Sequence, residues 1–166
     1  MKLLRHGPLG QERPGLCDEQ GRIRDLSGLV PDWTPEQLAP QALATLAQQV
    51  AAQADQLPLV PSGTRLGVPV AGIRQFLGIG LNYRQHAIEA GMAIPTEPIV
   101  FSKSITALAG PDDDLPLPMG SVALDYEVEL GIVIGSTARR VAQAHALQHV
   151  AGYVLANDVS ERDWQL

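Results

Sequence analysis

The stretch "ALDYEVELGIVIG" (residues 123–135) combines the apolar pattern of a β-strand with two closely spaced carboxylates. Side chains alternate between the two faces of a strand, so one face carries Tyr126, Val128, Leu130, Ile132 and Ile134. We expect this apolar face to pack into a core. The opposite face carries Glu127 and Glu129, which project side by side about 6.6 Å apart along the strand. Two like charges this close repel each other, so the face needs water or a cation.

Two explanations fit the glutamate pair. The strand is either half exposed, with water solvating its acidic face, or it offers both carboxylates to a divalent cation. The first is common because glutamate is seldom buried without a partner. The second follows from the preference of hard cations such as Mg²⁺ for oxygen ligands, since one positive centre removes the mutual repulsion.

A third carboxylate follows another apolar segment. The stretch "YVLANDVS" (residues 153–160) is apolar through Leu155 and then presents Asn157, Asp158 and Ser160. These residue types are typical of helix caps and turns, which is one explanation. The alternative is that Asp158 ends a strand that neighbours the one with Glu127 and Glu129. All three carboxylates could then meet in one place.

His86 and Glu89 form a second candidate pair, within "YRQHAIEAG" (residues 83–91). A spacing of three places both side chains on the same face of a helix, where they can form a hydrogen bond. A carboxylate that orients an imidazole and raises its basicity creates a general base near neutral pH. A surface ion pair without catalytic role is the alternative.

A lysine near the end of an expected strand is the last candidate. Lys103, in "VFSKS" (residues 100–104), is one of two lysines in the chain, whose other basic residues are arginines. Its ammonium group could bind the carboxylate of a substrate. A solvated surface side chain is the alternative.

Composition restricts the class of partner and the compartment. The chain has 166 residues, a net charge of −6 and no extended run of lysine or arginine, so we expect neither a nucleic-acid nor a membrane partner. Its one cysteine, Cys17, provides no intramolecular disulfide, which favours a cytoplasmic protein. The start "MKLLRHGPLG" lacks the apolar region of a signal peptide.

The expected elements divide the chain into two domains. Residues 1–70 contain short strands near the start and an amphipathic helix over 40–55, and we expect them to form a small N-terminal α+β module. Residues 57–72 are interrupted repeatedly by proline and glycine and are the expected link. Residues 71–166 then carry a strand over 74–83, a strand followed by a polar loop over 97–108, and strands over 123–135 and 151–166, the last with an acidic and polar end. Helices are expected over 83–91 and 141–150.

Four long blocks, taken in order, resemble the fumarylacetoacetate hydrolase family. They are "GIGLNYRQHAIEAG" (78–91), "PIVFSKSITALAGPDDDLPLP" (98–118), "DYEVELGIVIG" (125–135) and "VAGYVLANDVSERDWQ" (150–165). The resemblance is to the short bacterial type, which includes acylpyruvases and 2,4-diketo-3-deoxy sugar acid hydrolases. It implies an α+β fold that is mostly β, built as a mixed β-roll, and usually a homodimer.

The resemblance also implies a site and a reaction. Family ligands of Mg²⁺ or Mn²⁺ correspond to Glu127, Glu129 and Asp158. The family's catalytic dyad corresponds to His86 and Glu89 on a lid helix, and Lys103 is expected to place positive charge near the substrate. The expected reaction is hydrolysis of a C–C bond in a 2,4-dioxo acid, giving pyruvate and a carboxylic acid.

Two alternatives stay open within this resemblance. One is a decarboxylase of the oxaloacetate type, or an isomerase, that uses the same metal site. The other is a catalytically incomplete fragment that binds metal without turnover. The family's Gly-Lys-x-x-Asp segment and its Gly-Thr-Pro-x-Gly loop are absent from the sequence. We therefore expect residues 71–166 to be the N-terminal part of a catalytic domain that is truncated at its C-terminus.

Overall fold

The structure is a computed structural model and describes residues 1–165. Its fold is α+β and mostly β, as the sequence predicts. The chain forms two compact units, one of residues 1–71 with residues from 109 onward, the other of residues 72–108. The expected domain boundary at residue 70 stays a prediction. Across residues 1–165, no helix has both the length and the apolar character that a membrane span requires.

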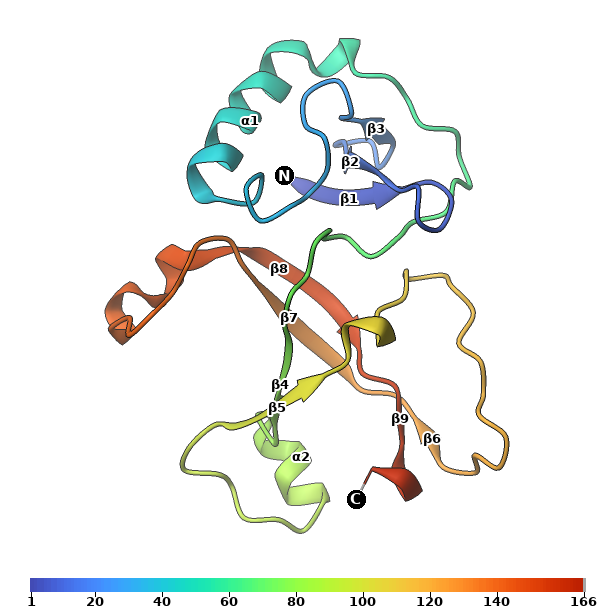
Figure 1. Ribbon diagram of the computed structural model, residues 1–166, viewed down its shortest axis with the longest axis vertical. Coiled ribbons are helices and arrows are strands. Elements are labelled where there is room, and N and C mark those ends of the chain that lie inside the picture. The colour runs from blue at the N-terminus through green and yellow to red at the C-terminus, as the bar shows by residue number, and fades with distance from the viewer. Residues whose placement is uncertain (166) are drawn as a thin grey trace. The chain divides into compact units, whose positions relative to one another are not determined.

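The first unit begins with a small antiparallel sheet. Strands β1 (Lys2–His6), β2 (Arg13–Cys17) and β3 (Ile23–Asp25) are ordered β1-β2-β3. Helix α1 (Pro40–Gln53) lies beside this sheet and is followed by the short 3-10 helix η1 (Ala54–Gln56) (Figure 1). Proline suits the start of α1 because its missing N–H would have no partner within the helix. The expected helix over 40–55 is confirmed.

The hydrophobic core lies between this sheet and α1. Trp33 is fully buried, and its indole Nε1–H donates a hydrogen bond to the carbonyl oxygen of Leu4 at 2.6 Å. A buried indole needs such a partner, because an unpaired buried donor is costly. The buried core cluster consists of Leu16, Leu26, Val30, Trp33, Leu38, Leu46 and Leu57.

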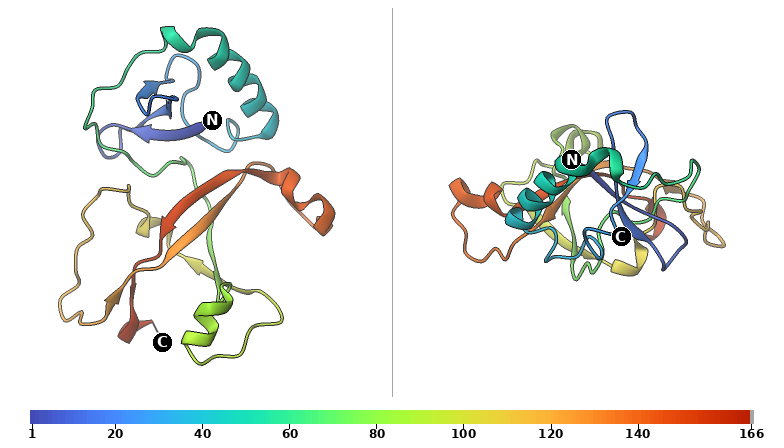
Figure 2. Two further views of the ribbon diagram at one scale, coloured as in Figure 1. Left: turned by 180° about the vertical axis from the view of Figure 1, so that it is seen from behind. Right: turned by 90° about the horizontal axis from the view of Figure 1, so that it is seen from above.

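The strand expected over 123–135 is present in two pieces. These are β6 (Leu124–Asp125) and β7 (Val128–Ile134). After the 3-10 helix η3 (Gln143–His149), where we expected an ordinary helix, comes β8 (Val150–Asn157). The short β9 (Ser160–Glu161) and the 3-10 helix η4 (Arg162–Trp164) follow. β7 pairs with β8 and β6 pairs with β9, both antiparallel. Figure 1 and the left view of Figure 2 show β7 and β8 running side by side.

The expected core face of β7 is wrong for the part of the chain that the structure describes. The side chains of this face are between 56% and 75% exposed; they are Tyr126, Val128, Leu130, Ile132 and Ile134. The opposite face is the more covered one, because Val133 and Ala151 pack against the core cluster. In residues 1–165 this sheet has only two strands, and the core covers one of its faces. The carboxylates therefore lie on the better-protected face.

The second unit holds the remaining regular elements. Strands β4 (Phe76–Gly80) and β5 (Ile99–Lys103) form an antiparallel pair. Helix α2 (Arg84–Glu89) follows β4, and the 3-10 helix η2 (Ile105–Ala107) follows β5. β4, α2 and β5 coincide with segments that the sequence predicts, whereas η2 lies where we expected a polar loop.

Gly135 is needed where the end of β7 meets the core. A Cβ atom at this position would lie 2.4 Å from the carbonyl oxygen of Leu38 and 2.7 Å from Cβ of Ala151, which real Cβ atoms do not tolerate. Gly135→Ala should therefore lower the free energy of unfolding by about 1–3 kcal/mol, the usual cost of overpacking. Urea denaturation measures the effect. Gly152→Ala is the matched control, because nothing lies within 4 Å of its added methyl group. Equal stability of the two variants would contradict the packing described for Gly135.

Candidate metal centre

The pairing of β7 with β8 places Glu127 directly opposite Asp158. The N–H of Glu127 donates to the carbonyl oxygen of Asp158 at 3.1 Å, and the N–H of Asp158 donates to the carbonyl oxygen of Glu127 at 2.8 Å. The two residues thus form a hydrogen-bonded pair one step beyond the paired residues Val128 and Asn157. Residues opposite each other in an antiparallel ladder direct their side chains to the same face. The carboxylates of Glu127 and Asp158 therefore share one face of the sheet.

Glu129 joins this pair because it lies two residues along β7, on the same face as Glu127. Its partner across the sheet is Ala156, whose methyl side chain occupies little space. One carboxylate oxygen from each of Glu127, Glu129 and Asp158 lies within 4.8 Å of the other two. All three residues are half-buried. The structure therefore brings together the three residues that the sequence suggests as ligands.

This set of donors fits a hard divalent cation. Three carboxylates gathered at one point repel one another, and partial burial strengthens the repulsion because water screens it less. A cation with a preference for oxygen ligands would remove that repulsion, and carboxylates suit Mg²⁺ and Mn²⁺. The metal-binding role of these residues stays a prediction.

Arg162 is a member of this cluster that sequence reasoning missed. Its Nη2 lies 2.5 Å from Oε1 of Glu127 and 2.8 Å from Oδ2 of Asp125. The pKa of Arg162 is raised by its hydrogen bond to Asp125 and then by the one to Glu127. The pairing of β6 with β9 creates this contact, because it holds the N–H of Arg162 2.9 Å from the carbonyl oxygen of Ala123. The available signal was a lone arginine four residues after Asp158.

The remaining predicted site residues lie in the second unit. His86 and Glu89 are both on α2, where Glu89 accepts a hydrogen bond from Nε2 of Gln85 at 3.4 Å. Lys103 ends β5, with its Nζ 5.8 Å from the centre of the Phe101 ring. Such a distance is within the range of a cation–π contact. The pairing of His86 with Glu89, and the catalytic roles of all three residues, stay predictions.

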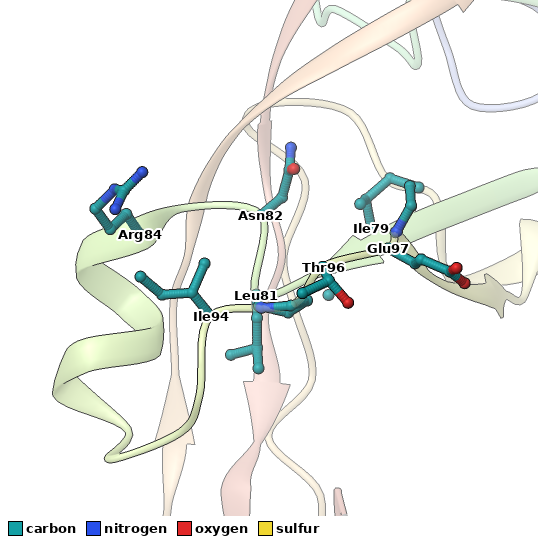
Figure 3. Close-up of a pocket in the computed structure, with 10 residues that line it drawn as sticks. Ile79, Leu81, Asn82, Arg84, Ile94, Thr96 and Glu97 are labelled. Carbon is teal, nitrogen blue, oxygen red and sulfur yellow. The ribbon is translucent and has the colours of Figure 1, made fainter.

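A hollow of about 300 Å³ adjoins α2 within this second unit (Figure 3). It is formed by the end of β4 and the segment that leads into β5. Its walls are mixed, with the polar side chains of Asn82, Arg84, Thr96 and Glu97 beside apolar ones such as Ile79 and Ile94. Leu81 in its wall has a positive φ of 48°, which is unusual for a residue with a side chain. Sequence reasoning did not identify this hollow.

Comparison with known proteins gives a family. Residues 75–166 match the family model described as "Fumarylacetoacetate (FAA) hydrolase C-terminal", which is more than half of the chain. The chain belongs to the fumarylacetoacetate hydrolase family. Curated relatives of this family include a "Putative hydrolase" of Burkholderia ambifaria that is 53% identical over all 166 residues and one of Burkholderia lata that is 52% identical. The chain spans 58% of the length of each of these relatives.

Solved structures of the same family agree with the fold. A fumarylacetoacetate hydrolase from Exiguobacterium antarcticum is 29% identical with a TM-score of 0.73, covering 99% of this chain and 58% of its own. A maleylpyruvate hydrolase from Sphingobium sp. SYK-6, in complex with manganese(II) and pyruvate, is 25% identical with a TM-score of 0.77. This match covers 98% of the present chain and 60% of the hydrolase. A 5-carboxymethyl-2-hydroxymuconate delta-isomerase from Mycobacterium smegmatis is 26% identical with a TM-score of 0.66, covering 99% and 57%.

The carboxylate cluster makes a prediction for the protein without divalent cations. Glu129→Gln preserves the shape of the side chain and removes one of three mutually repelling charges. In EDTA the variant should gain about 0.5–1 kcal/mol in free energy of unfolding, the size of one partly exposed charge interaction. Urea denaturation in EDTA measures this gain.

Glu161→Gln is the contrasting control for that measurement. The carboxylate of Glu161 accepts hydrogen bonds from the hydroxyl of Ser121 and from the N–H of Ala123, so its neutralisation should lower stability. A loss of stability in EDTA for Glu129→Gln as well would contradict the repulsion.

Proposed function

We propose that this protein is a divalent-metal-dependent hydrolase that cleaves a C–C bond in a 2,4-dioxo acid. Its substrate would be an acylpyruvate or a diketo-deoxy sugar acid, and its products pyruvate and a carboxylic acid. The observation that carries the proposal is the convergence of Glu127, Glu129 and Asp158 on one point. The proposal is supported by a relative of the same family that is a maleylpyruvate hydrolase in complex with manganese(II) and pyruvate.

The three carboxylates would hold Mg²⁺ or Mn²⁺. When bound, such a cation supplies Lewis acidity toward the 2-oxo carboxylate of the substrate and stabilises negative charge that develops there. The chain's own contribution is preorganisation. The paired backbones of Glu127 and Asp158 fix two of the carboxylates, and β7 fixes the third.

The proton transfers are assigned to α2. His86 would accept a proton from a water molecule, and the resulting hydroxide would attack the distal carbonyl carbon of the substrate. The C–C bond then breaks, its electron pair passes to the pyruvate carbon, and that carbon takes up a proton. Glu89 would orient the imidazole of His86 and raise its basicity. Lys103 would provide positive charge for a substrate carboxylate.

Two other functions have some support. The isomerase from Mycobacterium smegmatis favours an isomerase, and a decarboxylase of the oxaloacetate type would use the same ligands. A metal-binding protein without turnover is the other, because three converging carboxylates could hold a cation whether or not a reaction follows.

The expected setting is a cytoplasmic homodimer that acts on a small molecule, without a nucleic-acid or membrane partner. The net charge of −6 argues against binding to polyanions. The exposed apolar face of β7, with Val128 and Leu130, is consistent with a partner subunit.

A substrate panel tests the proposed reaction. The purified protein is incubated with Mg²⁺ or Mn²⁺ and acylpyruvates, and pyruvate and the released acid are quantified. Equal amounts of pyruvate and acid are expected, with none in EDTA. Carbon dioxide released from oxaloacetate would instead support a decarboxylase, and an isomerised product would support an isomerase. If no substrate turns over while the cation still raises the melting temperature, the result supports a metal-binding protein without turnover.

The assignment of His86 makes a separate prediction. His86→Ala should lower kcat by a factor of about 10²–10⁴, which is the usual contribution of a general base. The Mn²⁺-induced rise in melting temperature should stay intact. His145→Ala is the matched control, because His145 is an exposed residue of η3. A His86→Ala protein with full activity would remove the assignment.

A further inference from the structure

Arg162 contacts two different carboxylates, one inside the cluster of three and one outside it. Its Nη2 contacts Oε1 of Glu127 at 2.5 Å and Oδ2 of Asp125 at 2.8 Å, and its Nε donates to the same Asp125 oxygen at 3.0 Å. Its Nη1 also donates to Oε1 of Gln165 at 3.1 Å. One guanidinium group therefore bridges a proposed metal ligand and a carboxylate outside the ligand set.

The two carboxylates differ in exposure and in role. The side chain of Glu127 is 20% exposed and belongs to the cluster of three, whereas that of Asp125 is 48% exposed and does not. Asp125 receives two of the guanidinium nitrogens and Glu127 receives one. The bond to Asp125 can therefore persist when the bond to Glu127 is broken.

A divalent cation on Glu127 would compete with Arg162 for the negative charge of that carboxylate. Both would draw on the same carboxylate, and two cations on one carboxylate repel each other strongly where solvent screening is reduced. In the absence of a divalent cation, the positive charge of Arg162 offsets part of the repulsion among the three carboxylates. Binding of the cation and contact of Arg162 with Glu127 are thus in competition.

We propose that Arg162 is a built-in counter-cation of the metal centre, which neutralises Glu127 before a divalent cation binds and withdraws onto Asp125 when one does. This inference rests on the proposed metal centre and adds a regulation of its affinity. The bond with Glu127 keeps the acidic cluster stable without metal, at the expense of metal affinity. Asp125 continues to accept hydrogen bonds from Arg162 after this withdrawal, so the withdrawal costs little free energy.

Titration of the purified protein with Mn²⁺, monitored by the electron paramagnetic resonance signal of the free ion, tests the competition. Arg162→Gln should bind Mn²⁺ about twofold to fivefold more tightly than the original protein, the range expected for one partly exposed ion pair. Its melting temperature should be lower in EDTA, and the difference should shrink at saturating Mn²⁺. A variant that merely folds poorly would be less stable under both conditions.

Arg139→Gln is the matched control for charge. It removes the same charge from an exposed residue beyond the far end of β7, so its Mn²⁺ affinity should change less than about twofold. Asp125→Asn tests whether Asp125 retains Arg162 when a cation binds. It should weaken Mn²⁺ binding when Arg162 is present and have little effect in the Arg162→Gln background. A purely long-range effect of the Asp125 charge would be the same in both backgrounds, and that result would overturn the role of Asp125.

Failure of the inference differs from failure of the metal centre. In one outcome, Glu127→Gln abolishes Mn²⁺ binding while Arg162→Gln binds Mn²⁺ as tightly as the original protein or more weakly. That result overturns the competition proposed for Arg162 and leaves the proposed metal centre intact. If the original protein does not bind Mn²⁺ at all, both are overturned.

Discussion

The antiparallel pairing of β7 with β8 is the constraint on which the candidate site depends. Its register sets Val128 against Asn157 and extends by one further pair, in which Glu127 and Asp158 exchange two backbone hydrogen bonds. Because the side-chain period of a strand is two, a slip of one residue would turn the carboxylates to the opposite face. The packing of Val133 and Ala151 against the core cluster resists such a slip, since it holds the other end of the same sheet.

This arrangement concentrates negative charge on the better-covered face of the sheet. Such a concentration opposes folding unless it is neutralised, and Arg162 contributes a positive charge in contact with Glu127. Stability and the proposed metal binding therefore make opposite demands on Glu127. The stable state without metal favours an ion pair with arginine, whereas a metal centre needs the carboxylate available. Active sites often contain groups that lower stability in this way.

Much of the fold follows from local patterns in the sequence. Proline at the start of α1, the alternation in β7 and the position of Asp158 directly after β8 are all visible in the residues themselves. The buried face of β7 was predicted wrongly, because alternation indicates that two faces differ and not which one the rest of the chain covers. Leu130 and Ile132 are exposed in the described part of the chain, although they are among its most apolar residues.

The carboxylate cluster could be anticipated because its members adjoin strands with strong patterns, but the contact of Arg162 with it could not. Its contact with Glu127 depends on the short pairing of β6 with β9, and a two-residue strand leaves almost no periodic signal. The hollow beside α2 was missed for a similar reason. It is formed by irregular segments around Leu81 and Thr96, and no repeating pattern in the sequence predicts their conformation.

The most direct test of the central claim is a crystal structure of the protein grown with Mn²⁺, with diffraction data collected at the manganese absorption edge. A metal centre formed by the β7–β8 pairing predicts one anomalous peak within coordination distance of carboxylate oxygens from Glu127, Glu129 and Asp158. A peak bound by other residues, with none at these three carboxylates, would contradict it.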